Sequence, residues 1–270
     1  MSVRDYSVDA LVIHEKPLGD HDKILTLLTS EQGKVNVIAK GAKSLKNRYM
    51  PACRAFVWGN FEIHERSADS RWLRDASVNE SFGGLSEDIA MMYLATYIAD
   101  VCMELSGQNE PAEDMLRLAL NTYYALSRKL KPVPQIKAVF EWKAAELSGY
   151  MPDLSCCRIC GKTVSDMFYL DVMNGGLVCP GCAASEIPAQ EYPGAVPVDE
   201  YGTRLILLPL RGQVAAALRY VLEVPMKNML GFELRNPSDL SDFAKICETY
   251  LLSHLETGFS SLKYYRELTK

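Results

Sequence analysis

Two pairs of cysteines, each with the spacing Cys-x-x-Cys, are the residues in this sequence best suited to chemistry. Cys157 and Cys160 form the first pair, Cys179 and Cys182 form the second, and 18 residues separate the pairs. This spacing is typical of a zinc site, because a hairpin can bring together two tight turns that each present two thiolates. We therefore predict one structural Zn2+ bound by these four residues. Four sulfur ligands leave no coordination position open for a catalytic water.

The residues around the cysteine pairs predict how the pairs are positioned. Residues 167–170 and 176–178 are apolar enough to form the two arms of the hairpin. Gly161 and Gly181 would give the two turns their conformational freedom. Cys156 stands directly before the first ligand and is an alternative ligand that the spacing alone does not exclude.

The remaining motifs do not predict catalysis. A thiol-redox site would place a single Cys-x-x-Cys at the start of a helix, whereas two such pairs across a hairpin favour metal. A zinc deaminase would need His-x-Glu and then Pro-Cys-x-x-Cys, but Val178 precedes Cys179. The four histidines lie far apart in the sequence. We therefore expect a protein without enzymatic activity.

Basic residues are concentrated in one segment of an otherwise acidic chain. The 270 residues include 29 Lys and Arg against 34 Asp and Glu, which gives a net charge of −5. Residues 32–61 contain no acid. Such a segment can contact phosphate, with an affinity that falls as salt rises. The predicted phosphate-binding residues are Lys34, Lys40, Lys43, Lys46, Arg48 and Arg54.

No part of the sequence predicts a membrane protein. No apolar run reaches the ~18–20 residues that cross a bilayer. Residues 1–9 include two acids and lack the apolar core of a signal peptide. We therefore expect a cytoplasmic protein with no membrane partner.

The first 82 residues predict a small β domain. Val35, Val37 and Ala39 fall on one face of a strand, while Lys34 and Lys40 fall on the opposite face. Five short strands in about 80 residues favour a closed barrel such as an OB-fold, and a small sandwich fits almost as well.

From residue 83 the hydrophobic pattern becomes helical. It predicts helices over residues 90–105, 111–123, 135–148 and 210–223, and a last helix that Ser238 caps and Gly258 ends. The predicted fold class is therefore α+β, with an N-terminal OB-fold barrel in residues 1–82 and a mostly helical domain in residues 83–270. The zinc module is inserted in the second domain at about residues 150–186. Residues 187–202, rich in Pro and Gly, predict a connector.

Five stretches of the chain, in this order and spacing, resemble the bacterial DNA repair protein RecO family. The resemblance spans nearly the whole chain and is more specific than any single motif. The stretches are residues 10–34; residues 39–43 with Arg48; residues 140–141 followed by 147–154; the cysteine hairpin with residues 175–177; and residues 250–256 with 261–263.

The resemblance implies a recombination mediator that binds single- and double-stranded DNA and anneals complementary strands. Such proteins work with RecR to help load RecA onto DNA coated with single-strand binding protein (SSB), which also implies association with the nucleoid. A site for the acidic SSB tail is expected in the helical domain, with Arg128, Lys129 and Lys131 as candidates. A rival interpretation is a protein–protein adaptor with a structural zinc hairpin and no direct role on DNA.

Two tryptophans in the β domain have two possible roles. An OB barrel binds single strands by stacking bases on aromatic side chains, and Trp58 and Trp72 could serve in this way. We favour the alternative that they pack in the barrel core, because aromatic side chains are mostly buried.

Overall fold

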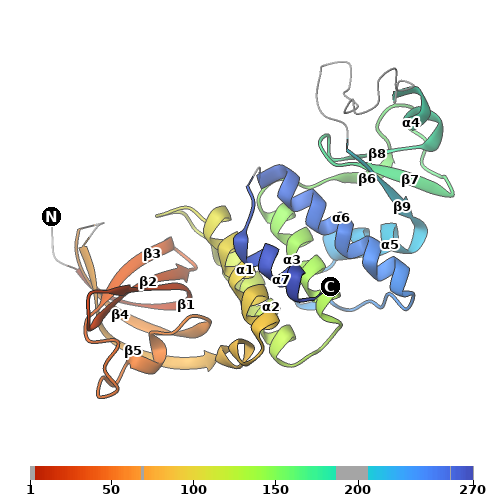
Figure 1. Cartoon of the computed structure of the whole chain (residues 1–270). Coiled ribbons are helices and arrows are strands. Elements are labelled where there is room, and N and C mark those ends of the chain that lie inside the picture. Colours follow the sequence, from red (N-terminus) through yellow and green to blue (C-terminus); the bar gives the residue numbers. More distant parts are fainter. Residues whose placement is uncertain (1–3, 68–69, 187–205, 256, 270) are drawn as a thin grey trace, which may run out of the picture. The chain divides into compact units, whose positions relative to one another are not determined.

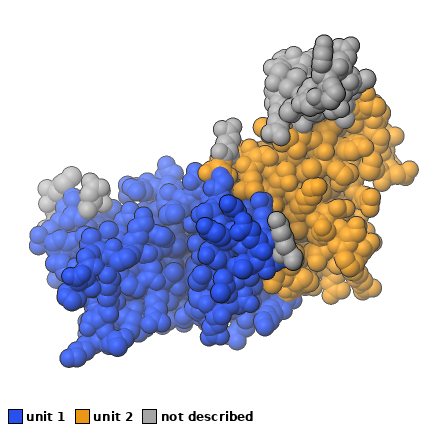
Figure 2. Space-filling model, viewed as in Figure 1, with its two compact units in different colours: residues 1–130, 258–270 blue, residues 131–257 orange. Residues whose placement is uncertain are grey.

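The computed structural model describes residues 4–67, 70–186, 206–255 and 257–269, and most of the predicted connector, residues 187–202, lies outside them (Figure 1). The fold class is α+β, with strands at the N-terminus and a mostly helical region after them. The chain forms two compact units (Figure 2). Unit 1 comprises residues 1–130 and 258–270, and unit 2 comprises residues 131–257. The predicted boundary after residue 82 lies inside unit 1 and remains a prediction.

The N-terminal strands of unit 1 form a closed barrel (Figure 1). Its order is β1-β2-β3-β5-β4, and every pairing is antiparallel except the parallel contact of β3 with β5. The predicted apolar face of one strand is confirmed, since Val35, Val37 and Ala39 are all buried in the barrel core. The strands are β1 (Arg4–Leu18), β2 (Asp22–Thr29), β3 (Gly33–Ala39), β4 (Val57–Ser67) and β5 (Ser70–Ser81).

The turn from β2 to β3 packs against the segment between the first two helices. Gly33 has a positive φ of 60°, and a Cβ added there would meet Gly107 O at 2.3 Å. Only glycine therefore allows this close approach of two backbones. Hydrogen bonds from Lys34 N to Gly107 O (2.9 Å) and from Asn109 N to Gln32 O (2.9 Å) fix the contact.

Helices complete unit 1. They are α1 (Ile89–Leu105), α2 (Glu113–Ser127) and α7 (Ser260–Leu268), with short 3-10 turns η1 (Met50–Ala52) and η2 (Gly83–Glu87). Asp88 caps α1 by accepting a hydrogen bond from Met91 N at 3.0 Å. Tyr123 in α2 donates to Ala95 O at 2.9 Å. The sequence pattern does not predict α7, which packs on α1 through Tyr93–Tyr264 ring contact and the hydrogen bond from Ser261 to Asp100.

Unit 2 is built on the packing of α3 against α6 (Figure 1). Lys137 in α3 binds Glu141 (2.6 Å) and Glu248 of α6 (2.7 Å), which satisfies a buried ammonium group. Asn236, and not the predicted Ser238, caps α6, because its side chain accepts the hydrogen bond from Ser238 N. The helices of unit 2 are α3 (Val133–Leu147), α4 (Pro180–Glu186), α5 (Gly212–Glu223), the 3-10 turn η3 (Met226–Asn228) and α6 (Pro237–Leu255).

A four-stranded sheet in unit 2 has the order β6-β8-β7-β9 (Figure 1). The predicted hairpin is confirmed as β7 (Met167–Asp171) and β8 (Gly176–Val178), which pair antiparallel. Two further strands extend it, β6 (Asp153–Cys157) and β9 (Leu207–Arg211). The predicted helix over 210–223 is therefore too long, because Leu210 pairs with Phe168 in the sheet and α5 begins at Gly212. Across the described ranges, no helix combines the length and the apolar character needed to cross a membrane.

Candidate metal centre and basic barrel surface

The four predicted cysteine ligands lie together at one end of the unit 2 sheet. Their sulfur atoms all lie within 4.8 Å of one another, and the Sγ atoms of Cys160 and Cys179 are 3.7 Å apart. Parallel pairing of β6 with β8 brings the two pairs together, since Cys157 ends β6 and Cys179 directly follows β8. A tetrahedral ion with Zn–S bonds of about 2.3 Å requires S···S distances of about 3.8 Å. The donor set therefore fits a thiophilic metal ion.

The first cysteine turn is shaped by backbone hydrogen bonds. Gly161 has a φ of 72° and donates to Cys157 O at 2.8 Å, so glycine is needed at this position. Burial disfavours ionisation of Cys157, but backbone N–H groups of Cys160, Cys179 and Ile159 outweigh it and lower its pKa to about 6. A thiolate at neutral pH is the form that binds metal.

The second cysteine pair has a different local structure. Cys179 N points at the Cys157 sulfur (3.4 Å), and the backbone N–H of Cys182 lowers the pKa of Cys179. Cys182 lies in α4, where its hydrogen bond with Cys160 raises its pKa to about 12. Gly181 also lies in α4, and a side chain there would meet open space, so the predicted need for glycine is wrong. Metal binding must displace the protons that the cluster retains.

Cys156 does not belong to the sulfur cluster. Successive residues of a strand point to opposite faces, so Cys156 and Cys157 in β6 cannot both face the metal position. Cys157 is buried and belongs to the cluster, whereas Cys156 is half-buried and does not. The structure therefore resolves the ambiguity left by the spacing.

An ion pair ties the first cysteine turn to the hairpin. Arg158, between two of the cysteines, donates from Nε and from Nη2 to Oδ2 of Asp171, at 2.9 and 2.8 Å. Asp171 is fully buried in β7 and also accepts a hydrogen bond from Asn174 Nδ2 at 2.9 Å. Such contacts beyond the ligands hold a metal site in its geometry.

The predicted phosphate-binding residues divide between a strand and a loop of unit 1. Lys34 lies in β3, is half-buried and donates to Met103 O at 2.5 Å, which satisfies a carbonyl in the last turn of α1. The other five residues lie on the β3–β4 loop, residues 40–56, and are exposed. They are Lys40, Lys43, Lys46, Arg48 and Arg54.

Several of the loop residues have a local partner. Lys43 donates to Gly19 O at 2.6 Å, and thereby ties the β3–β4 loop to the β1–β2 turn. Arg48 forms an ion pair with Asp75 at 2.9 Å while its side chain stays 77% exposed. Lys40 lies over the Trp72 ring at 4.5 Å. Exposed pairs of this kind cost little to break, so these groups can exchange partners.

A groove of about 490 Å³ lies beside Lys34, between the barrel strands and the end of α1, where Met103 and Gln108 line it. Thr26 and Asn36 form its floor between β2 and β3, and cationic or titratable side chains surround it. None of the described residues that line it carries a carboxylate. Sequence patterns missed its members His14, Lys16 and Arg71. Pairing of β1 with β2 places the first two there, and the contact of β3 with β5 places Arg71.

Neither tryptophan of the barrel belongs to its core, so the favoured sequence interpretation is wrong. Trp58 and Trp72 are both half-buried on strands whose neighbouring residues, such as Val57 and Leu73, point inward. Lys40 and Arg66 lie over the Trp72 ring, at 4.5 and 5.1 Å from its centroid. A cationic environment around an accessible ring is suited to stacking on a base.

The candidates for the SSB tail lie in two different units. Arg128 and Lys129 follow α2 in unit 1, where Arg128 lies over the Tyr124 ring at 5.6 Å. Lys131 begins unit 2 and forms an ion pair with Glu233 at 3.6 Å. Their assignment to a tail site remains a prediction.

Comparison with known proteins gives consistent matches. Family models described as "Recombination protein O N terminal" and "Recombination protein O C terminal" match residues 1–82 and 86–196. Both descriptions name recombination proteins, and neither names a catalytic activity. A "DNA repair protein RecO" of Acetivibrio thermocellus is 27% identical over 96% of this chain and 96% of its own. Proteins of the same name from Anaeromyxobacter dehalogenans and a Thermoanaerobacter species are 33% and 26% identical, over 80% and 98% of this chain and 83% and 99% of their own.

The matches agree with the order of elements along the chain. The first model spans the barrel, and the second begins just before α1 and extends beyond the cysteine cluster. The relatives cover both regions. The chain therefore belongs to the RecO family of DNA repair proteins.

Proposed function

We propose that this protein is a recombination mediator that binds single- and double-stranded DNA and anneals complementary strands. With RecR it helps load RecA onto DNA coated with SSB. It acts in the cytoplasm, on DNA of the nucleoid, and performs no covalent chemistry. The DNA-binding domain is residues 1–82, and residues 83–270 form the helical domain with the zinc module at about residues 150–186.

The barrel topology supports assignment of residues 1–82 as an OB-fold. A five-stranded barrel in the order β1-β2-β3-β5-β4, closed by β1 against β4, has the strand arrangement of that fold. OB-folds bind oligonucleotides on the face of strands 2 and 3 and through the adjoining loops.

The observation that carries the proposal is the acid-free groove on this β2–β3 face. His14, Lys16, Lys34 and Arg71 line it, and Asn36 and Thr26 add hydrogen-bonding groups. Arg71 is buried and held by an ion pair with Glu65 at 2.7 Å, so Lys16, Lys34 and His14 are the groups that would meet phosphate. A groove with this charge follows a phosphate backbone and needs no particular base sequence. Because the whole chain has a net charge of −5 and would repel phosphate, binding to DNA depends on a local concentration of cations.

The β3–β4 loop extends this site in the proposal. Lys40 is the link, because it follows β3 directly and lies over Trp72. A strand held in the groove would stack a base on Trp72 and meet Lys43, Lys46, Arg48 and Arg54 with its phosphates. The groove and loop together form an electrostatic and stacking platform on which two strands can pair.

We assign the metal as one structural Zn2+ held by Cys157, Cys160, Cys179 and Cys182. Closely spaced thiolates favour zinc over harder cations. Because β6, β8 and α4 all meet at the cluster, the ion would stabilise the fold of the module. Its role in DNA binding is indirect.

The helical domain is the proposed site for partner proteins. Arg128, Lys129 and Lys131 are basic and suit the acidic tail of SSB, although Lys131 must then release Glu233. Contact with RecA is indirect, through RecR and the displacement of SSB.

The test of the proposal is strand annealing by the purified protein. Complementary fluorescent single strands, bare and then coated with SSB, are mixed with the protein over a salt series and without nucleotide. We expect faster pairing that needs no ATP and declines as salt rises. If pairing is not accelerated and no DNA is retained even at low salt, the protein is instead an adaptor that leaves DNA to a partner.

A further inference from the structure

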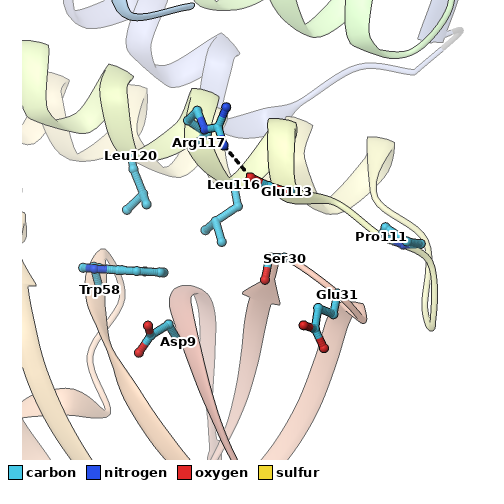
Figure 3. Close-up of a pocket in the computed structure, with 9 residues that line it drawn as sticks. All are labelled: Asp9, Ser30, Glu31, Trp58, Pro111, Glu113, Leu116, Arg117 and Leu120. Atoms are coloured by element: carbon cyan, nitrogen blue, oxygen red, sulfur yellow. Dashed lines mark hydrogen bonds and ion pairs between the residues drawn. The ribbon is translucent and has the colours of Figure 1, made fainter.

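A second groove in unit 1 is lined by apolar and acidic residues, unlike the acid-free groove beside Lys34. It has a volume of about 510 Å³ and lies between the barrel and α2 (Figure 3). In Figure 3, Leu116 and Leu120 extend from α2 toward the barrel, where the Trp58 ring lies below them. Leu120 and Trp58 are each half-buried, so the groove offers apolar surface at its centre.

The rim of this groove is acidic. Asp9, Glu31 and Glu113 line it and are all exposed. Arg117 is the one cation among the described lining residues, and it is engaged by Glu113 and lies 3.9 Å from Asp114. Carboxylates at these positions repel phosphate, so the charge of this groove disfavours a nucleic-acid strand.

Hydrogen bonds join the elements on the two sides of the groove and orient one of its carboxylates. Ala112 N donates to Ser30 O at 2.8 Å, which joins the start of α2 to the end of β2. Asn60 Nδ2 donates to Asp9 Oδ1 at 2.9 Å, which orients that carboxylate on β1. A site that is formed before its ligand arrives loses little entropy on binding.

We propose that this groove, formed by Asp9, Glu31, Trp58, Glu113, Leu116 and Leu120, docks a basic peptide segment of a partner protein. An aliphatic anchor of the size of leucine enters between Trp58 and Leu120. Arginine or lysine on either side of the anchor binds Asp9, Glu31 and Glu113, and the Trp58 ring also attracts a cation. Charge complementarity identifies the occupant, because an apolar centre with an acidic rim fits a basic segment and disfavours an acidic one.

This docking surface extends the protein beyond strand handling. The groove lined by Lys16 and Lys34, the basic groove, would hold DNA, while the groove lined by Asp9, Glu31 and Glu113, the acidic groove, would hold a protein. No residue lines both grooves. The two activities can therefore be lost separately, and failure of one does not imply failure of the other.

The experiment measures binding of a labelled peptide to the full chain at low salt by fluorescence anisotropy. The probe has a central leucine with two arginines on each side. One comparison peptide has glutamates in place of the arginines, and another has glycine in place of the leucine. We expect both changes to weaken binding at least about tenfold, since charge and anchor both contribute.

Variants of the chain identify the site. Trp58→Ala and the charge reversal Glu31→Lys should each weaken binding of the basic peptide about tenfold. Glu62→Lys is the matched control, since Glu62 is exposed on β4 and does not line the groove. Trp58→Phe keeps an apolar ring and should retain most of the affinity, which guards against loss by misfolding. DNA binding should be unchanged in the two Trp58 variants, and Glu31→Lys and Glu62→Lys, which add the same charge, should change it equally.

Three results would overturn the proposal. The first is equal affinity for the leucine and glycine peptides, because the arginines alone would then account for binding and the groove would hold no apolar anchor. The second is equal weakening by Glu62→Lys and Glu31→Lys. The third is self-association in sedimentation that Glu31→Lys abolishes, because the occupant would then be the β3–β4 loop of a second copy, where Leu45 is 86% exposed between Lys43 and Lys46.

Discussion

The carboxylate of Asp171, which has no exposed surface, is bound by the guanidinium of Arg158 at 2.8 and 2.9 Å. Arg158 lies between the cysteines of the first pair, and Asp171 ends β7. This ion pair therefore connects the position of two candidate metal ligands to the hairpin that supports them. The Arg158 side chain packs over Gly176 of β8, where an added Cβ would make ordinary contact with it at 3.4 Å.

Replacement of Asp171 should loosen the metal site without removing a ligand. Asp171→Asn leaves Arg158 without its counter-charge, and we expect the free energy of unfolding to fall by about 2–3 kcal/mol. The loss is smaller than for a fully buried pair because the Arg158 side chain is 30% exposed. Urea unfolding measures this loss, and the rate of zinc extraction by a chelator should rise. Asp166→Asn, an exposed control on the same module, should change neither quantity.

Removal of a ligand should affect stability more than DNA affinity. Cys179→Ser leaves three thiolates, so zinc content should fall from about one ion per chain toward zero, with a lower melting temperature. Cys156→Ser is the control, because Cys156 lies outside the sulfur cluster. Mass spectrometry measures the zinc content of each variant, and thermal unfolding measures its melting temperature. An unchanged melting temperature in Cys179→Ser would remove the structural role.

The cysteine site could be predicted from the sequence because its determinants are local. The two pairs are joined by a single hairpin, and its arms β7 and β8 lie between them in the sequence. The sequence pattern extends the helix into the last two residues of β9, because the short apolar run around Leu208 and Leu210 shows no period that separates helix from strand. Only its pairing with β7, more than thirty residues away in the sequence, decides the matter.

The basic groove could be predicted only in part, because pairing of four strands assembles it from distant parts of the sequence. Lys34 stood out through the acid-free segment, whereas Lys16 and Arg71 lie in segments of mixed charge. Arg71 reaches the groove through the parallel contact of β3 with β5, and no turn signal announces a contact of that kind. The sequence likewise does not show that Trp72 lies outside the core, because only the folded barrel shows which face of strand β5 is buried.

Charge reversal on the β3–β4 loop should weaken DNA binding in a salt-dependent way. Lys43→Glu and Lys46→Glu should each lower affinity at low salt and flatten the slope of log affinity against log salt by ~1–2 units. Lys46 is the cleaner probe, because Lys43 also bonds to Gly19 O. Lys245→Glu on α6, an exposed lysine of unit 2, controls for net charge. Slopes equal to that of the control would exclude the loop from the DNA site.

Trp72 should distinguish single strands from duplex. A base in a single strand can stack on its ring, and loss of such a contact costs about 1–3 kcal/mol. Trp72→Ala should therefore weaken binding of an oligothymidine more than binding of a duplex of equal length. Trp58→Ala is the matched control, because Trp58 lines the acidic groove instead. Equal losses on both DNA forms would assign Trp72 a purely structural role.

His254 should make the stability of unit 2 depend on pH. Its ring lies between Tyr150 and Tyr250, at centroid distances of 4.7 and 4.4 Å. Burial lowers the pKa of His254 below its ordinary value of 6.5, although the hydrogen bond to Tyr250 O opposes the shift. The folded chain therefore takes up its proton at lower pH than the unfolded chain does. Its contribution to stability is present above pH ~6.5 and is lost as the pH falls from there through the folded-state pKa.

The replacement His254→Phe tests this dependence while it keeps a ring between the tyrosines. Urea unfolding from pH ~8 to ~5 should show a steeper loss of stability on the acid side in the original protein than in the variant. Acid releases metal from both proteins alike, so the difference between them reports His254. His21→Phe, at an exposed histidine of unit 1, should retain the full dependence. Parallel curves of unfolding free energy against pH for the original protein and for His254→Phe would contradict this prediction. The His254 ring would then bind its proton equally in the folded and unfolded chain, and its burial between the tyrosines would not disfavour its charge.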